Sequence, residues 1–174
     1  MNMRNCKWTA LALIAIFHLG CASKSAKQLP PPLSDAEPVM VQDLKITAGQ
    51  TIYVPAYSEI YYSNDRTLNL TITLSIRNTD LTNSIVLTSV RYFDTHGQLV
   101  REYLSQPKRL GPMASSSFFV ETSDRIGGIG ANFIVEWVAE QSVYEPVVEA
   151  IMIDTSGNQG ISFVSTGRVI ERLE

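Results

Sequence analysis

Residues 68–78 read Leu-Asn-Leu-Thr-Ile-Thr-Leu-Ser-Ile-Arg-Asn, a strict alternation of aliphatic and polar side chains. Successive side chains of a β-strand point to opposite faces of a sheet, so the five aliphatic residues from Leu68 to Ile76 would share one face. An amphipathic helix would instead need apolar residues every three or four positions. The stretch therefore predicts a β-strand with one buried face and one solvated face.

The same alternation continues on both sides of this stretch. Asp94-Thr-His-Gly97 is a polar turn with glycine where a positive φ is needed. Further strands are expected at residues 51–62 (bent at Pro55), 84–93, 98–104, 115–122, 132–139, 147–153 and 161–164. Short strands, frequent turns and no helical periodicity predict an all-β fold, an antiparallel immunoglobulin-like β-sandwich of about seven to nine strands.

Residues 127–130 read Gly-Gly-Ile-Gly, a composition also found in loops that bind phosphate. Such a loop needs a strand before it and a helix after it, so that the helix N-terminus faces the anion. Here the following segment, Phe133 to Val138, has the pattern of a strand, and no Lys-Ser or Lys-Thr pair follows. We therefore expect a long hairpin loop whose glycines permit left-handed turns, and no phosphate site.

Residues 1–20 have the features of a lipoprotein signal peptide. Two basic residues precede an apolar run from Ala10 to Phe17, which is shorter than the roughly 20 residues of a bilayer-spanning helix. The run ends in His18-Leu-Gly-Cys21, which resembles the bacterial lipobox, where the cysteine is lipidated after cleavage. His18 departs from the leucine usual at that position. The alternative is an ordinary cleaved signal with an incidental cysteine.

An acylated Cys21 would hold the protein on a lipid bilayer, because two or more buried fatty chains anchor stably. Ala22 replaces the aspartate of an inner-membrane retention signal, so we expect the outer membrane, facing the periplasm, if the cell has two membranes. Residues 21–45 contain four prolines and predict an extended tether. A single β-sandwich domain is expected at residues 46–174.

The charge and the cysteine count exclude several classes of function. The chain has 14 basic and 17 acidic residues, a formal net charge of −3, and cleavage before Cys21 would remove two of the basic ones. An acidic chain without a basic run argues against nucleic acid as a partner. Cys21 would be the only cysteine left, so no disulfide is expected. Ligands for a cysteine- or histidine-based zinc site are lacking, and no cofactor is expected.

Five stretches are distinctive as a set: Tyr53-Val-Pro-Ala-Tyr-Ser-Glu-Ile-Tyr-Tyr62, Leu74-Ser-Ile-Arg-Asn-Thr79, Gly130-Ala-Asn-Phe-Ile-Val-Glu-Trp137, Glu145-Pro-Val-Val-Glu149 and Thr155-Ser-Gly-Asn-Gln-Gly-Ile-Ser-Phe-Val164. Together they resemble an uncharacterised bacterial lipoprotein family, domain of unknown function 3124. The resemblance implies a bacterial envelope protein of unknown activity. It brings no established catalytic residues.

Candidate catalytic groups are few. His96 is the only histidine left after cleavage, so a nucleophilic triad would have to combine it with a serine and an acid such as Asp94. A histidine in a polar turn needs no such role. Glu136 and Glu149 interrupt apolar strands, and on neighbouring strands they could serve glycoside hydrolysis. They could equally face solvent or pair with arginines, namely Arg77 and Arg91, across strands.

Tyrosines and loop glycines suggest a binding surface, because tyrosine offers rigid contact area with a polar tip. The candidate surface comprises Tyr53, Tyr57, Tyr61, Tyr62, Gly128, Gly130, Asn132 and Asn158. The alternative is that the tyrosines pack within or border the sandwich. The sequence favours a non-catalytic binding or assembly module of the envelope, with another envelope protein or a glycan as partner. The alternative function is a small envelope hydrolase acting on a cell-wall or glycan substrate.

Overall fold

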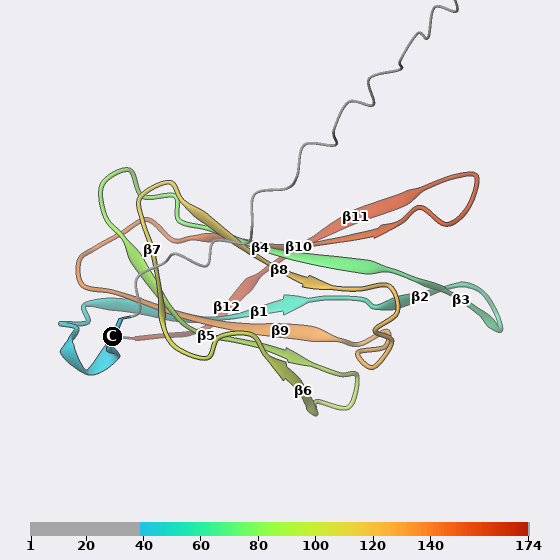
Figure 1. Cartoon of the computed structure of the whole chain (residues 1–174), viewed down its shortest axis with the longest axis horizontal. Helices are drawn as coiled ribbons and strands as arrows, with labels where there is room; N and C mark the ends of the chain where they lie inside the picture. Colours follow the sequence, from blue (N-terminus) through green and yellow to red (C-terminus); the bar gives the residue numbers. More distant parts are fainter. Residues whose placement is uncertain (1–38, 174) are drawn as a thin grey trace, which may run out of the picture. The chain divides into compact units, whose positions relative to one another are not determined.

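A computed structural model describes residues 39–173, whose regular secondary structure is antiparallel β-strand apart from one short 3-10 turn (Figure 1). In spatial order the larger sheet contains β12 (Arg168–Arg172), β1 (Ala48–Pro55), β9 (Asn132–Ala139), β5 (Ile85–Phe93) and β6 (Leu99–Glu102), and β7 (Lys108–Leu110) also pairs with β5. The smaller sheet contains β11 (Ile161–Thr166), β10 (Val147–Asp154), β4 (Thr71–Arg77) and β8 (Ser115–Val120). A separate hairpin is formed by β2 (Glu59–Ser63) and β3 (Arg66–Asn69).

The two sheets pack through the faces that the alternation predicts. Leu70, Ile72, Leu74 and Ile76 are fully buried, and they belong to one core cluster with Phe133 and other residues of the larger sheet. Removing these aliphatic side chains from water is the main contribution to folding. The prediction of an antiparallel sandwich is confirmed.

The number of strands differs from the expected seven to nine, because twelve occur among residues 39–173. Two expected strands are each divided. After Pro55 the backbone N–H groups of Ala56 and Ser58 bind the carbonyls of Ala131 (2.9 Å) and Gly128 (3.2 Å), which precede β9, and the chain then pairs with β3 and not with the larger sheet. Between β3 and β4 the Leu70 N–H binds the Ser58 carbonyl at 2.8 Å.

Two further strands, β7 and β12, lack the pattern that reveals strands in a sequence. β7 has three residues, and β12 reads Arg-Val-Ile-Glu-Arg, with charges at both ends. β12 follows β11 after a single residue, Gly167, although the two strands belong to different sheets. A Cβ on Gly167 would lie 2.7 Å from Ile52 Cγ2 and 3.0 Å from the Val148 carbonyl, so a larger residue would not fit where the chain crosses.

The described part of the chain begins inside the segment that the sequence assigns to the tether. The Val39 N–H lies 3.5 Å from the Pro107 carbonyl, and residues Val41–Asp43 form the 3-10 turn η1. Cys21 and the predicted signal peptide lie outside the described residues. Within residues 39–173, no helix is long and apolar enough to cross a membrane.

Candidate functional surface at one end of the sandwich

The glycine stretch lies in the loop that joins β8 to β9 at one end of the sandwich. β8 belongs to the smaller sheet and β9 to the larger one, so the hairpin prediction is wrong and the loop is a crossover between sheets. Hairpins and crossovers have similar local sequences, because both need turns, and only long-range pairing separates them. The predicted left-handed turn is present at Gly128, with φ of 71°.

The amide groups of the β8–β9 loop bind side chains of the same protein. The Gly128 N–H donates to Ser58 Oγ at 2.7 Å, and the Gly130 N–H donates to Thr95 Oγ1 at 2.9 Å. The Thr95 hydroxyl in turn donates to the Gly127 carbonyl at 2.9 Å. These bonds fasten the loop to the β1–β2 link and to the β5–β6 turn. They also occupy N–H groups that a phosphate would need, and β9 stands where a phosphate loop has its helix.

An open hollow of about 420 Å³ lies beside this loop. It is lined by residues of β6, β8 and the β8–β9 loop, namely Arg101, Phe119, Glu121, Ser123, Asp124, Arg125 and Ile126. Arg101 Nη2 forms an ion pair with Asp124 Oδ2 at 2.9 Å, and its guanidinium carbon lies 5.4 Å from the centre of the Tyr103 ring. Burial raises the pKa of the Tyr103 phenol, so its hydroxyl stays protonated beside Arg101.

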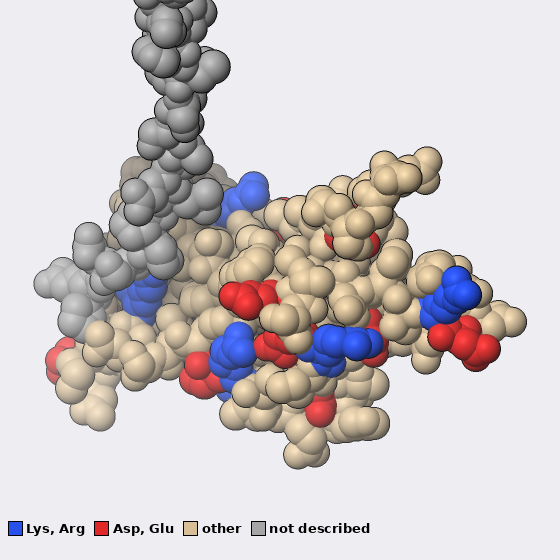
Figure 2. Space-filling view, turned by 45° about the vertical axis from the view of Figure 1, so that its right-hand side comes forward, with Lys and Arg blue, Asp and Glu red and all other residues tan. Residues whose placement is uncertain are grey.

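The hollow combines apolar and charged groups. Phe119 is 51 % exposed and Ile126 is 67 % exposed, beside two arginines and two acids. Arg125 Nη2 lies 3.4 Å from Glu59 Oε2, which connects the loop to β2. Figure 2 shows positive and negative side chains lying next to one another across the visible face. A surface of this kind suits a partner that is itself partly apolar and carries both donors and acceptors.

The four candidate tyrosines lie in three different environments. Tyr61 (66 % exposed) and Tyr62 (55 % exposed) are on β2, in the hairpin that extends from the body of the sandwich (Figure 1). Tyr53 is half-buried on β1, opposite Ile134 and Arg168. Tyr57 is half-buried and packs on the core, with its ring centre 5.8 Å from that of Phe163. The structure therefore separates the four tyrosines that the sequence grouped.

The other candidate residues are also dispersed. Gly128 and Gly130 lie in the β8–β9 loop, and Asn132 begins β9, paired with Pro55 and Phe93. Asn158 is exposed in the loop between β10 and β11, which lies on a different hairpin at the same end (Figure 1). The β8–β9 loop meets β2 through the contact of Arg125 with Glu59, which joins these two parts of the predicted surface.

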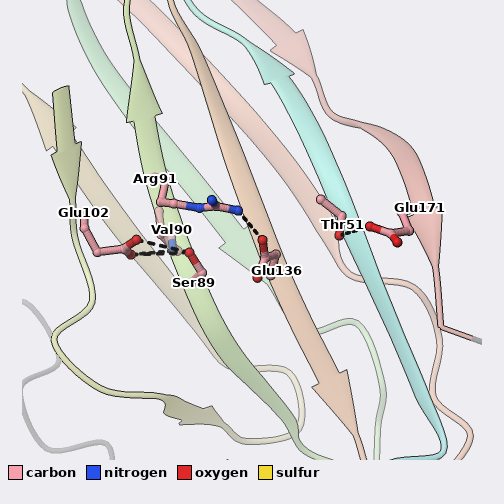
Figure 3. Close-up of polar contacts among 7 residues, drawn as sticks. All are labelled: Thr51, Ser89, Val90, Arg91, Glu102, Glu136 and Glu171. Carbon is pink, nitrogen blue, oxygen red and sulfur yellow. Dashed lines mark hydrogen bonds and ion pairs between the residues drawn. The ribbon is translucent and has the colours of Figure 1, made fainter. Parts of the chain in front are cut away.

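The two candidate carboxylates lie on opposite faces of the sandwich. Arg91 forms an ion pair with Glu136 across β5 and β9 (Figure 3), which confirms the cross-strand alternative for that glutamate. Glu136 lies on the outer face of the larger sheet, whereas Glu149 lies on the outer face of the smaller sheet. The two strands lie on opposite sides of the core, so the arrangement on neighbouring strands that glycoside hydrolysis would need does not occur, and the solvent-facing alternative holds for both residues. The carboxylate of Glu102 accepts hydrogen bonds from the Val90 N–H, at 3.1 Å, and from the Ser89 hydroxyl (Figure 3). This glutamate therefore also has a structural role.

His96 is an exposed residue of the β5–β6 turn, as expected. Its backbone N–H donates to Asp94 Oδ1 at 2.8 Å, the bond that stabilises such a turn. Among residues 39–173, no three side chains of His, Cys, Asp or Glu are grouped so as to hold a metal ion.

The residues of the hollow were missed by sequence reasoning. Arg101 and Phe119 come from strands in different sheets, so no local pattern joins them. Asp124, Arg125 and Ile126 directly precede the glycines. Charged and apolar residues side by side in a glycine-rich loop were the one signal that could have marked them.

Comparison with known proteins supports the family resemblance. Residues 49–170 match the model of a family described as "Protein of unknown function (DUF3124)". A solved structure described as "Crystal Structure of Thermotoga maritima 1070" is similar, with 12% identity and a TM-score of 0.42, covering 68% of this chain and 92% of that one. No curated protein matches the chain. Because the family model covers most of the β-sandwich and more than half of the whole sequence, this protein belongs to the DUF3124 family.

Proposed function

We propose that this protein is a non-catalytic binding or assembly module of the bacterial cell envelope, held on the membrane by an acylated Cys21. Its working surface is the end of the sandwich that carries the β2–β3 hairpin and the hollow beside the β8–β9 loop. Its partner is another envelope protein or a glycan. The observation that carries this proposal is the joining of exposed Tyr61 and Tyr62 to that hollow through the Arg125–Glu59 contact.

Three features support a binding role for this end. Two exposed tyrosines on the β2–β3 hairpin offer large contact area at a small cost in side-chain entropy, because a tyrosine side chain has few rotatable bonds. Exposed Phe119 and Ile126 add apolar area, and contiguous exposed apolar area on a monomer often marks an interaction site. The loop itself is held in place by Ser58 and Thr95, so little ordering is needed when a partner binds.

Site-specific crosslinking in the native envelope tests this proposal. A photoreactive residue in place of Tyr61 should capture a partner, whereas the same residue in place of Tyr144 should not. Tyr144 is the matched control, because it is 71 % exposed and lies in the β9–β10 loop at the opposite end of the sandwich. Equal capture at both positions, or capture at neither, would contradict the proposed surface.

Alanine substitution measures the contribution of the tyrosines. Tyr61→Ala or Tyr62→Ala should weaken capture by about 1–3 kcal/mol, the usual range for an interface tyrosine. Tyr57→Ala is not a suitable variant, because Tyr57 packs against Phe163 and its loss would destabilise the domain. His96→Ala should leave capture and every phenotype unchanged. A stable His96→Ala protein that loses function would count against a non-catalytic role.

A further inference from the structure

The outer side of β11 is an unpaired sheet edge within the described part of the chain. The Gly167 N–H binds the Val148 carbonyl at 2.8 Å, and Ala150 is opposite Ser165 in the same register. In an antiparallel pair, backbone groups of alternate residues face the same neighbouring strand. The odd-numbered residues of β11 therefore pair with β10. The N–H and C=O groups of the even-numbered residues, Ser162, Val164 and Thr166, point away from the sheet.

The other edges of the two packed sheets are protected, wholly or in part, in the ways that natural proteins use, which are charge, bulges, short strands and covering side chains. β12 carries Arg168, Glu171 and Arg172 and has a register shift in its pairing with β1. β6 and β7 have four and three residues and contain charged side chains. At β8 the Tyr103 hydroxyl donates to the Phe119 carbonyl at 3.1 Å, so that edge is partly covered.

β11 has none of these protections. Between Asp154 and Arg168 the sequence contains no Lys, Arg, Asp, Glu or Pro. Val164 is 55 % exposed, and Ser162 and Thr166 are also exposed. Half-buried Phe163 faces the core and packs near Tyr57, which holds the strand in place. In Figure 1 the β10–β11 hairpin extends past the other strands of its sheet.

We infer that β11 pairs with β11 of a second copy of this chain, antiparallel about a two-fold axis at Val164. This register places Ser162 opposite Thr166 of the other copy and Val164 opposite itself. Since the outward groups belong to Ser162, Val164 and Thr166, it satisfies all of them at once, with two hydrogen bonds for each residue pair. The two smaller sheets become one continuous sheet.

Charge explains why a second copy fits this edge and not the other one. About a two-fold axis each residue faces the residue equally far from the axis on the other side, so a strand with like charges at equal distances from the axis brings them together. β11 contains no charged residue, so pairing it with a second β11 brings no like charges together. The same arrangement of β12 about Ile170 would place Arg168 opposite Arg172, which is repulsive. The inference concerns a different surface from the proposed function and does not depend on it.

Disulfide trapping tests this contact in the full chain. Val164→Cys should give a disulfide-linked dimer on mild oxidation of intact cells that express it, because opposed residues of antiparallel strands lie about 4.5–5.5 Å apart, within disulfide range. Ile170→Cys is the matched control, since Ile170 is 57 % exposed on the opposite edge. The unmodified chain, which contains Cys6 and Cys21, gives the background. Dimer several-fold above both controls supports the inference, and dimer at the control level overturns it.

A charge substitution provides a second, reversible test. Val164→Lys places two ammonium groups opposite each other and should weaken self-association of the detergent-solubilised full chain by about tenfold or more, measured by analytical ultracentrifugation. Ile170→Lys should leave the dissociation constant unchanged. Far-UV spectra identical to the unmodified chain establish that both variants are folded. Equal dissociation constants for the two variants overturn the inference. A mixed disulfide of Val164→Cys with another protein, in place of the dimer, also overturns it.

Discussion

The Asp80 carboxylate connects two loops at the end of the sandwich opposite the proposed binding surface. Oδ1 accepts the N–H groups of Thr82 (2.9 Å) and Asn83 (2.8 Å), and Oδ2 accepts the Tyr144 N–H at 3.2 Å. Hydrogen bonds to the ionised form favour it, so those from Thr82 and Asn83 hold the pKa of Asp80 below its ordinary value of 3.8. The ionised carboxylate therefore stabilises the folded state.

This shift predicts a pH dependence of stability. Because the folded pKa is lower than the unfolded one, the stabilisation is complete above about pH 5 and is lost as the pH falls through 4 toward the folded pKa. Asp80→Asn should be less stable near pH 7 and should lose less further stability between about pH 5 and 3 than the unmodified protein. The midpoints of urea unfolding, measured across this pH range for both proteins, check the prediction. The control is Asp65→Asn, in the exposed β2–β3 turn, whose stability should depend on pH as that of the unmodified protein does. If the stability of Asp80→Asn is lower by the same amount at every pH, the role assigned to the Asp80 carboxylate is contradicted.

Gly127 is required by a close approach to the core. A Cβ at this position would lie 1.8 Å from Tyr92 Oη and 2.9 Å from the Ala131 Cβ. Gly127→Ala should therefore lower the free energy of unfolding by about 1–3 kcal/mol, the usual effect of overpacking. Gly111→Ala is the control, since nothing lies within 4 Å of its added Cβ, and it should change stability by less than about 0.5 kcal/mol.

Combination with Tyr92→Phe tests the stated cause. Removing the Tyr92 hydroxyl takes away the nearest atom, so the double variant should be more stable than the sum of the two single changes implies. Chemical denaturation of all four proteins gives the coupling. Strict additivity would mean that the Gly127→Ala effect does not come from contact with the Tyr92 hydroxyl.

At the scale of the element, β12 completes the larger sheet, and its two central residues have different environments. Val169 is opposite Ile52 and packs against the core, whereas Ile170 is 57 % exposed. Val169→Ala should reduce the free energy of unfolding by about 1–2 kcal/mol, because it removes partly buried methyl groups. Ile170→Ala should change it by less than about 0.5 kcal/mol. Thermal unfolding of both variants checks the difference, and equal effects would show that β12 does not contribute to the core.

The whole molecule, as proposed, is a sandwich domain carried on a lipid anchor. Cys21→Ser removes the thiol that would be acylated, so the variant should move from the membrane fraction to the soluble periplasmic or secreted fraction. Cell fractionation followed by immunoblotting measures this. Ser23→Ala, two residues further along, is the matched control and should remain membrane-bound. Unchanged membrane association of Cys21→Ser would remove the lipoprotein proposal.

The sequence by itself determined the class of the fold and the buried faces of most strands. The alternation in residues 68–78 and 132–139 is local information, since each side chain's direction follows from its neighbours along the strand. It therefore identified the core positions of β4 and of most of β9, and the Asp94–Gly97 turn with its positive φ at Gly97. The family resemblance was equally readable, because it depends on the order of residues alone.

The tertiary structure decided which strands share a sheet, and with them the candidate surface. Ser58 and Gly128 are 70 residues apart, and Thr95 and Gly130 are 35 apart, so no local pattern records their bonds. The same is true of the crossing at Gly167 and of the separation of Glu136 from Glu149. Such features depend on how a few alternating strands distribute between two sheets. Since every alternating strand can bury its apolar face in either sheet, alternation cannot choose among them.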